Sequence, residues 1–206
     1  MACAWIALLA AALALPAWAQ QDEPANSVFL VAKPSLVDPN FSRTVVLVTQ
    51  TPDGGTVGVI VNRPTPLKLS QFLSDEFETR NYSDPIFFGG PVMRQAIVAL
   101  FHADSAPPAP AFHVLKGLYL TMHPDNIKPL LAQRGWRYRL YAGFSGWAPR
   151  QLESEFNRDG WFVVTPDEET IFRKDYEGLW QDLVRRAETR PVGRYILRQF
   201  RSGGNQ

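Results

Sequence analysis

The segment Gly143-Phe144-Ser145-Gly146-Trp147-Ala148-Pro149-Arg150-Gln151-Leu152-Glu153 places two glycines and a tryptophan just ahead of a proline and a polar run. Glycine permits backbone conformations and close approaches that a Cβ forbids. Proline suits the first turn of a helix, where its missing N–H costs nothing. The segment therefore predicts a tight turn over residues 143–147 that leads into a helix beginning at Pro149.

The rest of the chain predicts strands joined to a few helices. Runs rich in β-branched and aromatic residues indicate strands at 28–31, 44–49, 56–62, 86–88, 96–102, 112–121, 138–142 and 161–165. Helical patterns cover 69–77 with Ser70 as its cap, 124–133, 149–157 and 175–187. Because strands come in consecutive groups before any regular alternation with helices, we expect one α+β domain with a curled, largely antiparallel sheet.

The N-terminus reads as an export signal over residues 1–19. Residues 6–16 are almost wholly apolar, and Ala17-Trp18-Ala19 supplies a small-x-small cleavage pattern ahead of Gln20. This predicts a periplasmic or otherwise exported domain of residues 20–206. A buried helix or a start codon placed too early are the alternatives, and either would leave the protein in the cytosol. The apolar run is shorter than the roughly 20 residues that a bilayer span needs, so we expect no transmembrane span in the mature chain.

Charge and cysteine content narrow the chemistry. The formal net charge of +1 argues against a chain devoted to nucleic acid, and export would make nucleic acid a still poorer partner. The only cysteine, Cys3, lies in the presumed signal, which leaves no disulfide or thiolate site for the mature protein, and we predict no cofactor.

An arginine-rich tail occupies residues 185–206. Its spacing would line three guanidinium groups along one side of a helix, at Arg190, Arg194 and Arg198. Such a face suits an anionic surface or a protein partner. It is equally explained as a solvated face that complements the C-terminal end of a helix dipole.

The glycine–tryptophan segment fails two motif tests. A nucleophile elbow needs glycine two residues beyond the serine, where this chain has Trp147. A phosphate loop needs a lysine followed by serine or threonine after its glycines, and none follows here. What remains is an anion site at the start of the Pro149 helix, or a turn that is merely tight.

Histidine pairing offers one metal hypothesis. If residues 96–103 and 112–119 form a hairpin across the proline-rich loop 105–111, His102 and His113 lie nearly opposite each other, about 5 Å apart at Cβ. Such a site would need a third ligand, for which Asp104 is the candidate, and the spacing does not define one. We therefore predict no metal.

Acid–base chemistry has candidates at strand ends and turns, namely Asp38, Asn62, Arg63 and His102. Each also has a structural explanation as a turn acceptor, a strand terminator or a rim histidine. Trp147 and Trp161 would suit an aromatic platform, although core packing explains them with less assumption.

Five motifs occur in order: residues 29–36 (FLVAKPSL), 38–41 (DPNF), 58–64 (GVIVNRP), 88–92 (FGGPV) and the glycine–tryptophan segment. Together they resemble the AlgH/YqgE family of small bacterial proteins, over about Val28 to Phe172. The resemblance implies a single α+β domain whose strongly bent sheet forms a pseudo-barrel flanked by helices. It implies an association with regulation of alginate synthesis for some members, and no settled catalytic residues. His102 matches the family's habitual histidine, whereas typical members look cytoplasmic and lack a leader.

The sequence thus predicts a non-enzymatic binding or regulatory protein, here exported. We expect its binding edge to comprise Asp38, Asn62, Arg63, Gly89, Gly90, His102, Gly143, Gly146, Trp147 and Glu153. One alternative is a hydrolase or other small-molecule enzyme that pairs His102 with Asp38 or Glu153. Another is a transcriptional regulator, if the N-terminus is not a signal.

Overall fold

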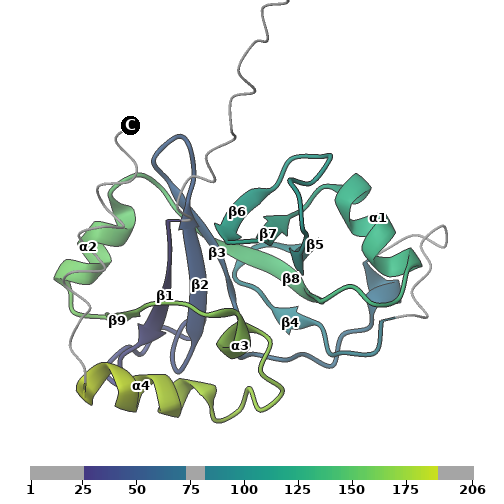
Figure 1. The fold of residues 1–206 in the computed structure, drawn as a ribbon. Helices are drawn as coiled ribbons and strands as arrows, with labels where there is room; N and C mark the ends of the chain where they lie inside the picture. The colour runs from purple at the N-terminus through teal and green to yellow at the C-terminus, as the bar shows by residue number, and fades with distance from the viewer. Residues whose placement is uncertain (1–25, 73–81, 190–206) are drawn as a thin grey trace, which may run out of the picture.

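A computed structural model of the chain describes residues 26–72 and 82–189. The predicted signal, most of the predicted helix 69–77 and the tail beyond Thr189 lie outside these residues. The described residues form one curled, mostly antiparallel half-barrel sheet with four short α-helices around it (Figure 1). The predicted fold class is confirmed.

The sheet has nine strands, ordered β6-β7-β5-β8-β3-β2-β1-β9, with β4 pairing parallel to β8. The strands are β1 (Ser27–Ala32), β2 (Val45–Gln50), β3 (Thr56–Ile60), β4 (Phe87–Phe88), β5 (Val92–His102), β6 (Phe112–Leu115), β7 (Leu118–Thr121), β8 (Tyr138–Trp147) and β9 (Trp161–Val164). The helices are the short 3₁₀ turn η1 (Leu69–Gln71), α1 (Pro124–Ala132), α2 (Gln151–Asn157), α3 (Glu168–Ile171) and α4 (Leu179–Thr189).

Strand β8 joins the two halves of the sheet. Its first half pairs with β5 and its last three residues pair with β3. Between them the chain bends at Gly143, whose φ of +69° favours glycine. A Cβ there would lie 2.7 Å from the Val92 carbonyl oxygen and 2.8 Å from that of Gly90. The predicted turn over residues 143–147 is therefore wrong, because these residues continue a bent strand.

The central strands are buried on both faces, which explains their continuous apolar sequences. In β1, Phe29 and Val31 face the inside of the curl, where α4 closes the core with Leu179 and Leu183. The alternate residues of β1 face a second core beneath α2 and β9. A third core lies between α1 and the outer face of β5 and β8 (Figure 1).

The sheet curls far enough for its first edge to approach β2. The Thr49 hydroxyl lies 3.4 Å from the His113 carbonyl oxygen of β6. This contact brings one edge strand against the inner face of the sheet, as the pseudo-barrel prediction requires.

Most predicted elements are present, with informative differences. The run 112–121 forms two strands, because Gly117 at φ +70° turns the chain between them. Helix α2 begins at Gln151 and not at Pro149, since Arg150 adopts a left-handed conformation at the N-cap. The sequence analysis missed α3, which Asp167 caps by accepting a 2.8 Å bond from the Thr170 N–H. Helix η1 begins after Lys68, so Ser70 is not its cap.

Helices long and apolar enough to cross a bilayer do not occur in the two described ranges.

Candidate functional site

The loop before β2 is held in place by Arg63. One nitrogen of its guanidinium donates to the Asn40 carbonyl at 2.7 Å, and the other donates to the Ser42 carbonyl at 3.0 Å. Burial lowers the pKa of the Arg63 guanidinium, and the nearby Asp38 carboxylate opposes that shift. Arg63 is thus a structural clamp on residues 38–43.

Asn62 clamps the same loop from the next position. Its side-chain oxygen accepts from the Val45 N–H at 2.8 Å, and its amide donates to the Arg43 carbonyl at 3.1 Å. The Asp38 carboxylate closes the turn by accepting a 2.8 Å bond from the Asn40 N–H. The structure therefore brings together Asp38, Asn62 and Arg63, as the sequence analysis predicted.

Phe88 and Arg94 complete this cluster from the other half of the sheet. The guanidinium carbons of Arg63 and Arg94 lie 5.7 Å and 5.5 Å from the centre of the Phe88 ring. Arg94 also donates a 3.2 Å hydrogen bond to the side-chain oxygen of Asn40. We call this region the Phe88 surface, and define it as Val37, Asp38, Asn40, Arg63, Phe88, Met93 and Arg94.

Two large apolar side chains of the Phe88 surface face solvent. Val37 is 87% exposed and Met93 is 62% exposed. Met93 has φ +46°, an unfavourable conformation for a residue with a Cβ. It lies in a bulge where the pairing of β5 with β8 shifts between Val92 and Ile97. The bulge turns Met93 and Arg94 away from the sheet and into solvent.

Some described arginines form ion pairs with carboxylates, whereas others, such as Arg139, donate to neutral groups. Arg137, Arg173, Arg185 and Arg186 all form ion pairs with aspartate or glutamate. No described carboxylate lies within ion-pair distance of Arg43, Arg63 or Arg94, although Asp38 acts on Arg63 from farther away. The Phe88 surface therefore carries positive charge that is only partly balanced.

The predicted glycines support this surface from below. Gly89 and Gly90 are buried, and a Cβ on either would collide with the backbone of β8. Together with Gly143, they let the segment after β4 pack directly on the bend of β8. Gly146 is exposed but belongs to the β8–β3 pairing. Gly89, Gly90 and Gly143 of the predicted binding edge are thus buried and support the surface from beneath.

Trp147 belongs to the core and not to an open platform. It is 5% exposed, and its indole N–H donates to Glu155 at 3.1 Å. The indole N–H of Trp161 donates to the other oxygen of the same carboxylate, also at 3.1 Å. Phe41 packs on both indole rings, with ring centres 5.7 Å and 5.6 Å away. The two tryptophans thus support the 38–43 loop through Phe41.

His102 lies at the opposite end of β5 from Arg94, eight residues of extended chain away, which is on the order of 20 Å. The carboxylates near its ring belong to Asp104, 3.6 Å from Nε2, and Glu168, 3.7 Å from Nδ1. Arg137 holds Glu168 through a 2.9 Å ion pair. Sequence reasoning missed Glu168, whose one signal was the acidic start of a helix at Asp167-Glu168-Glu169.

His102 and His113 do not face each other, so that prediction is wrong. Strand β6 pairs with β7 and not with β5, and His102 has Leu118 as its partner. His113 lies opposite Tyr119 and stacks on its ring at 5.1 Å. No cluster of three or more metal-ligating side chains occurs in the part of the chain that the structure describes.

Glu153, a residue of the predicted binding edge, lies on α2 and is partly buried. Arg185 and Arg186 of the tail pair with Asp182 and Asp167 of the domain itself. The tail arginines at 190, 194, 198 and 201 lie outside the described residues.

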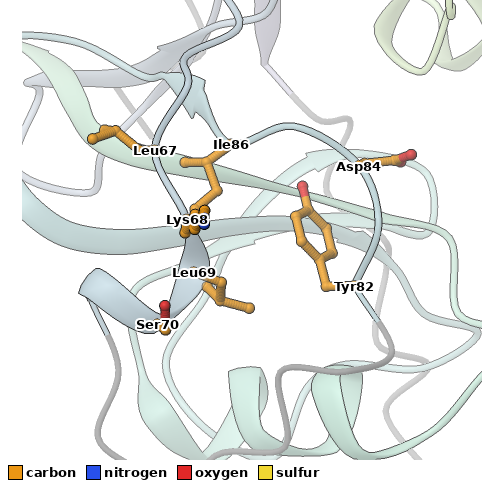
Figure 2. Close-up of a pocket in the computed structure, with 7 residues that line it drawn as sticks. All are labelled: Leu67, Lys68, Leu69, Ser70, Tyr82, Asp84 and Ile86. Atoms are coloured by element: carbon orange, nitrogen blue, oxygen red, sulfur yellow. The ribbon is translucent and has the colours of Figure 1, made fainter.

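A shallow pocket of about 260 Å³ opens beside η1 (Figure 2). It is lined by Leu67, Lys68, Leu69, Ser70, Tyr82, Asp84 and Ile86. The hydroxyl of Tyr82 already donates to the Pro85 carbonyl at 3.0 Å and accepts from the Leu140 N–H at 3.2 Å. This tyrosine is therefore a structural link to β8.

Comparison with known proteins agrees with the fold and its motifs. The AlgH-like family matches residues 29–192. The chain belongs to the AlgH-like family. An AlgH-like relative from Thermobifida fusca, named a UPF0301 protein, is 34% identical over 170 residues, covering 78% of this chain and 86% of that protein. A UPF0301 protein from Anaeromyxobacter dehalogenans is 32% identical over 185 residues, covering 84% and 94%.

Two solved structures share the fold. The solution structure of the AlgH protein from Pseudomonas aeruginosa superposes with a TM-score of 0.64, at 24% identity over 81% of this chain and 90% of that one. A crystal structure from Corynebacterium diphtheriae gives 0.61, at 26% identity over 80% and 88%. These likenesses establish a shared architecture and leave the function to be argued from the residues.

Proposed function

We propose that this AlgH-like protein is a non-enzymatic binding protein that recognises a partner protein through the Phe88 surface. One observation carries the proposal: Arg63 and Arg94 converge on Phe88 and Asn40 and join two distant segments into one ordered, partly exposed patch. Of the binding edge predicted from sequence, Asp38, Asn62 and Arg63 lie at or beside this patch.

Preorganisation supports this function. Arg63 and Asn62 fix the 38–43 loop through bonds to four backbone groups, which belong to Asn40, Ser42, Arg43 and Val45. A loop that is ordered before binding loses less conformational entropy when a partner docks. The clamp thus makes a surface loop suitable for recognition.

The composition of the surface supports a protein partner. Arginine, methionine and aromatic residues are enriched at protein interfaces relative to the rest of a protein surface. Here Met93, next to Arg94 in the chain, and Val37, next to Asp38, are exposed, and the partly exposed Phe88 ring lies within 6 Å of both guanidinium groups. An apolar centre with charged neighbours matches the usual anatomy of an interface.

Cross-linking from the surface itself tests the proposal. A photoreactive amino acid would replace Met93 in the full chain, expressed in its own bacterium. Met122 is the matched control, because it is also an exposed methionine, at 38%. We expect a discrete cross-linked protein from position 93 that is absent from position 122 and is lost when Arg94→Glu is added. Equal products from both positions, or no product from position 93, would refute the proposal.

A second candidate is an enzyme that uses His102 as a general base. The observation in its favour is that Glu168 faces Nδ1, which leaves Nε2 on the side of exposed Asp104. Comparing His102→Ala with Arg94→Glu in the cell separates the two. Each variant is expressed in a strain from which the gene has been deleted. If the protein acts by binding, His102→Ala should restore normal behaviour and Arg94→Glu should not. If it is an enzyme that uses His102, the opposite result is expected.

Export is also part of the proposal, and it rests on the signal-like pattern of residues 1–19. Fractionation of the native protein, with sequencing of its N-terminus, tests it. A mature chain that begins near Gln20 in the periplasm is expected. An intact N-terminus in the cytosol would favour the transcriptional regulator instead.

A further inference from the structure

We infer that the Phe88 surface recognises an acidic, partly apolar segment of its partner, with a carboxylate bound by Arg94 and an apolar side chain placed against Met93. This inference rests on the proposed function and adds the chemistry of the ligand. It follows from the hydrogen bonds, charge and exposure of the groups on this surface.

Arg94 has unused hydrogen-bonding capacity. A guanidinium carries five N–H donors in a planar fork that matches a carboxylate. Among the described residues, Arg94 donates one hydrogen bond, to the neutral side-chain amide of Asn40 at 3.2 Å. That bond orients the guanidinium without neutralising it, so the group is held ready for an anion.

Arg63 contributes the positive charge of its guanidinium to ligand binding, and we assign it no direct contact with the ligand. Its two terminal nitrogens already donate to backbone carbonyls of the 38–43 loop. Because neutral carbonyls accept these bonds, the positive charge of Arg63 persists on the same side of the sheet as Arg94. The positive charges of Arg63 and Arg94, both near the Phe88 ring, favour an anion at Arg94 over a neutral group.

The surface favours a carboxylate over a phosphate chain. The Asp38 carboxylate lies close enough to Arg63 to affect its pKa, and it would repel a densely charged polyanion. Met93 and Val37 present apolar area that a nucleic acid or a phosphate would leave unmatched. A protein segment that combines an acidic residue with an apolar residue satisfies both halves of the surface.

The spacing of the segment follows from the chain. Met93 and Arg94 are adjacent, and consecutive Cα atoms lie 3.8 Å apart. A ligand that contacts both therefore carries its carboxylate and its apolar side chain within about three residues of each other. Methionine adapts its shape to different apolar partners, so the apolar residue is less restricted in type than the acid.

Selection from a library of random dodecapeptides displayed on phage tests this inference on the full purified protein. We expect the enriched peptides to share an aspartate or glutamate within three residues of a leucine, isoleucine or phenylalanine. For one such synthetic peptide, Arg94→Glu should lower affinity at least tenfold, whereas Arg94→Lys, which keeps the charge but loses the fork, should lower it less. Replacing the acid of the peptide by its amide should have an effect similar to Arg94→Glu.

The binding position is read from the ¹³C-methyl NMR signals of Met93 and Met122. A peptide that shifts the Met93 signal and leaves Met122 unchanged binds as inferred. Peptides that shift Met93 but show no acidic preference would overturn the acidic ligand and leave the proposed function standing. Peptides that bind equally well to Arg94→Glu and leave Met93 unshifted, or a selection with no enrichment, would overturn both.

Discussion

Arg94 donates a 3.2 Å hydrogen bond to the side chain of Asn40, and so links the start of β5 to the loop that precedes β2. The two segments belong to different halves of the curled sheet, which also meet along β8 and where β6 approaches β2. Phe88 lies beside this link, within 6 Å of both Arg63 and Arg94. Arg63 therefore helps to build the Phe88 surface, whereas Arg94 and Met93 face solvent where a partner would bind.

Arg63→Ala should destabilise the fold far more than Arg94→Ala. The Arg63 change removes charge-assisted bonds to two backbone carbonyls, for an expected loss of about 2–3 kcal/mol in the free energy of unfolding. Arg94 is exposed, and its replacement should stay within about 0.5 kcal/mol. Urea denaturation of both variants measures the difference. Similar losses for the two would contradict the division between a clamp and a contact residue.

Gly143→Ala should be strongly destabilising, whereas Gly146→Ala should be tolerated. At Gly143 the left-handed backbone alone costs about 1–2 kcal/mol, and the Cβ would add close contacts with the carbonyls of Val92 and Gly90. At Gly146 the nearest atom to a new Cβ is 3.4 Å away and belongs to the ring of Phe144. Thermal denaturation of both variants tests the role of the bend, and an unaffected Gly143→Ala protein would disprove it.

Glu155→Ala should destabilise the protein by about 2–4 kcal/mol. The change leaves the indole N–H groups of two nearly buried tryptophans, Trp147 and Trp161, without their shared acceptor. Glu155→Gln keeps one acceptor oxygen and should lose about half as much. Denaturation followed by tryptophan fluorescence measures both variants. Equal losses of stability for Glu155→Ala and Glu155→Gln would mean that the carboxylate acts through its charge alone.

Tyr141→Phe should be tolerated at neutral pH and protective at high pH. The Tyr141 hydroxyl is buried and has no hydrogen-bond partner among the described residues, and burial raises its pKa to about 12 although the nearby Arg139 opposes the shift. An unfolded tyrosine loses its proton near pH 10. From about pH 10 to 12 the unfolded chain therefore binds fewer protons than the folded one, and the free energy of unfolding falls as pH rises.

Tyr141→Phe should abolish the part of this fall in the free energy of unfolding that ionisation of Tyr141 causes, which is up to about 3 kcal/mol at pH 12. Tyr82→Phe is a comparison at neutral pH only, because burial also raises the pKa of Tyr82. The Tyr82 hydroxyl makes two hydrogen bonds, and their loss should cost about 1–2 kcal/mol. Urea midpoints of Tyr141→Phe and the unmodified protein across this pH range, and of Tyr82→Phe at neutral pH, give the comparison. An identical pH dependence for Tyr141→Phe and the unmodified protein would refute the account.

The strands were predictable because both faces of the sheet are buried, which produces continuous apolar runs such as Val28 to Val31. The bend of β8 was not, since glycines within a strand and glycines in a turn have the same local signature. Only the packing of Gly89 and Gly90 on Gly143 distinguishes them, and that contact joins residues distant in sequence.

The candidate site was predicted only in part, because local sequence patterns reveal strand ends but not how the strands pair. Asp38, Asn62 and Arg63 mark strand ends, which local patterns reveal, and they do meet. Arg94 and Met93 were missed because their exposure results from a shift in strand pairing. The histidine pairing failed because an extra turn at Gly117 inserts β7 between the strands that carry His102 and His113.

Hydrogen–deuterium exchange of the full chain, with and without the protein recovered by the Met93 cross-link, shows which segments the partner covers. The hairpin 51–55 is an internal control, because it lies at the far end of β2 and β3 from the 38–43 loop (Figure 1), about 17–20 Å away by the length of these strands. If the partner binds the Phe88 surface, binding slows exchange in residues 38–43 and 92–95 and leaves the hairpin unchanged. Protection of the hairpin with no change in these two segments would contradict binding at the Phe88 surface.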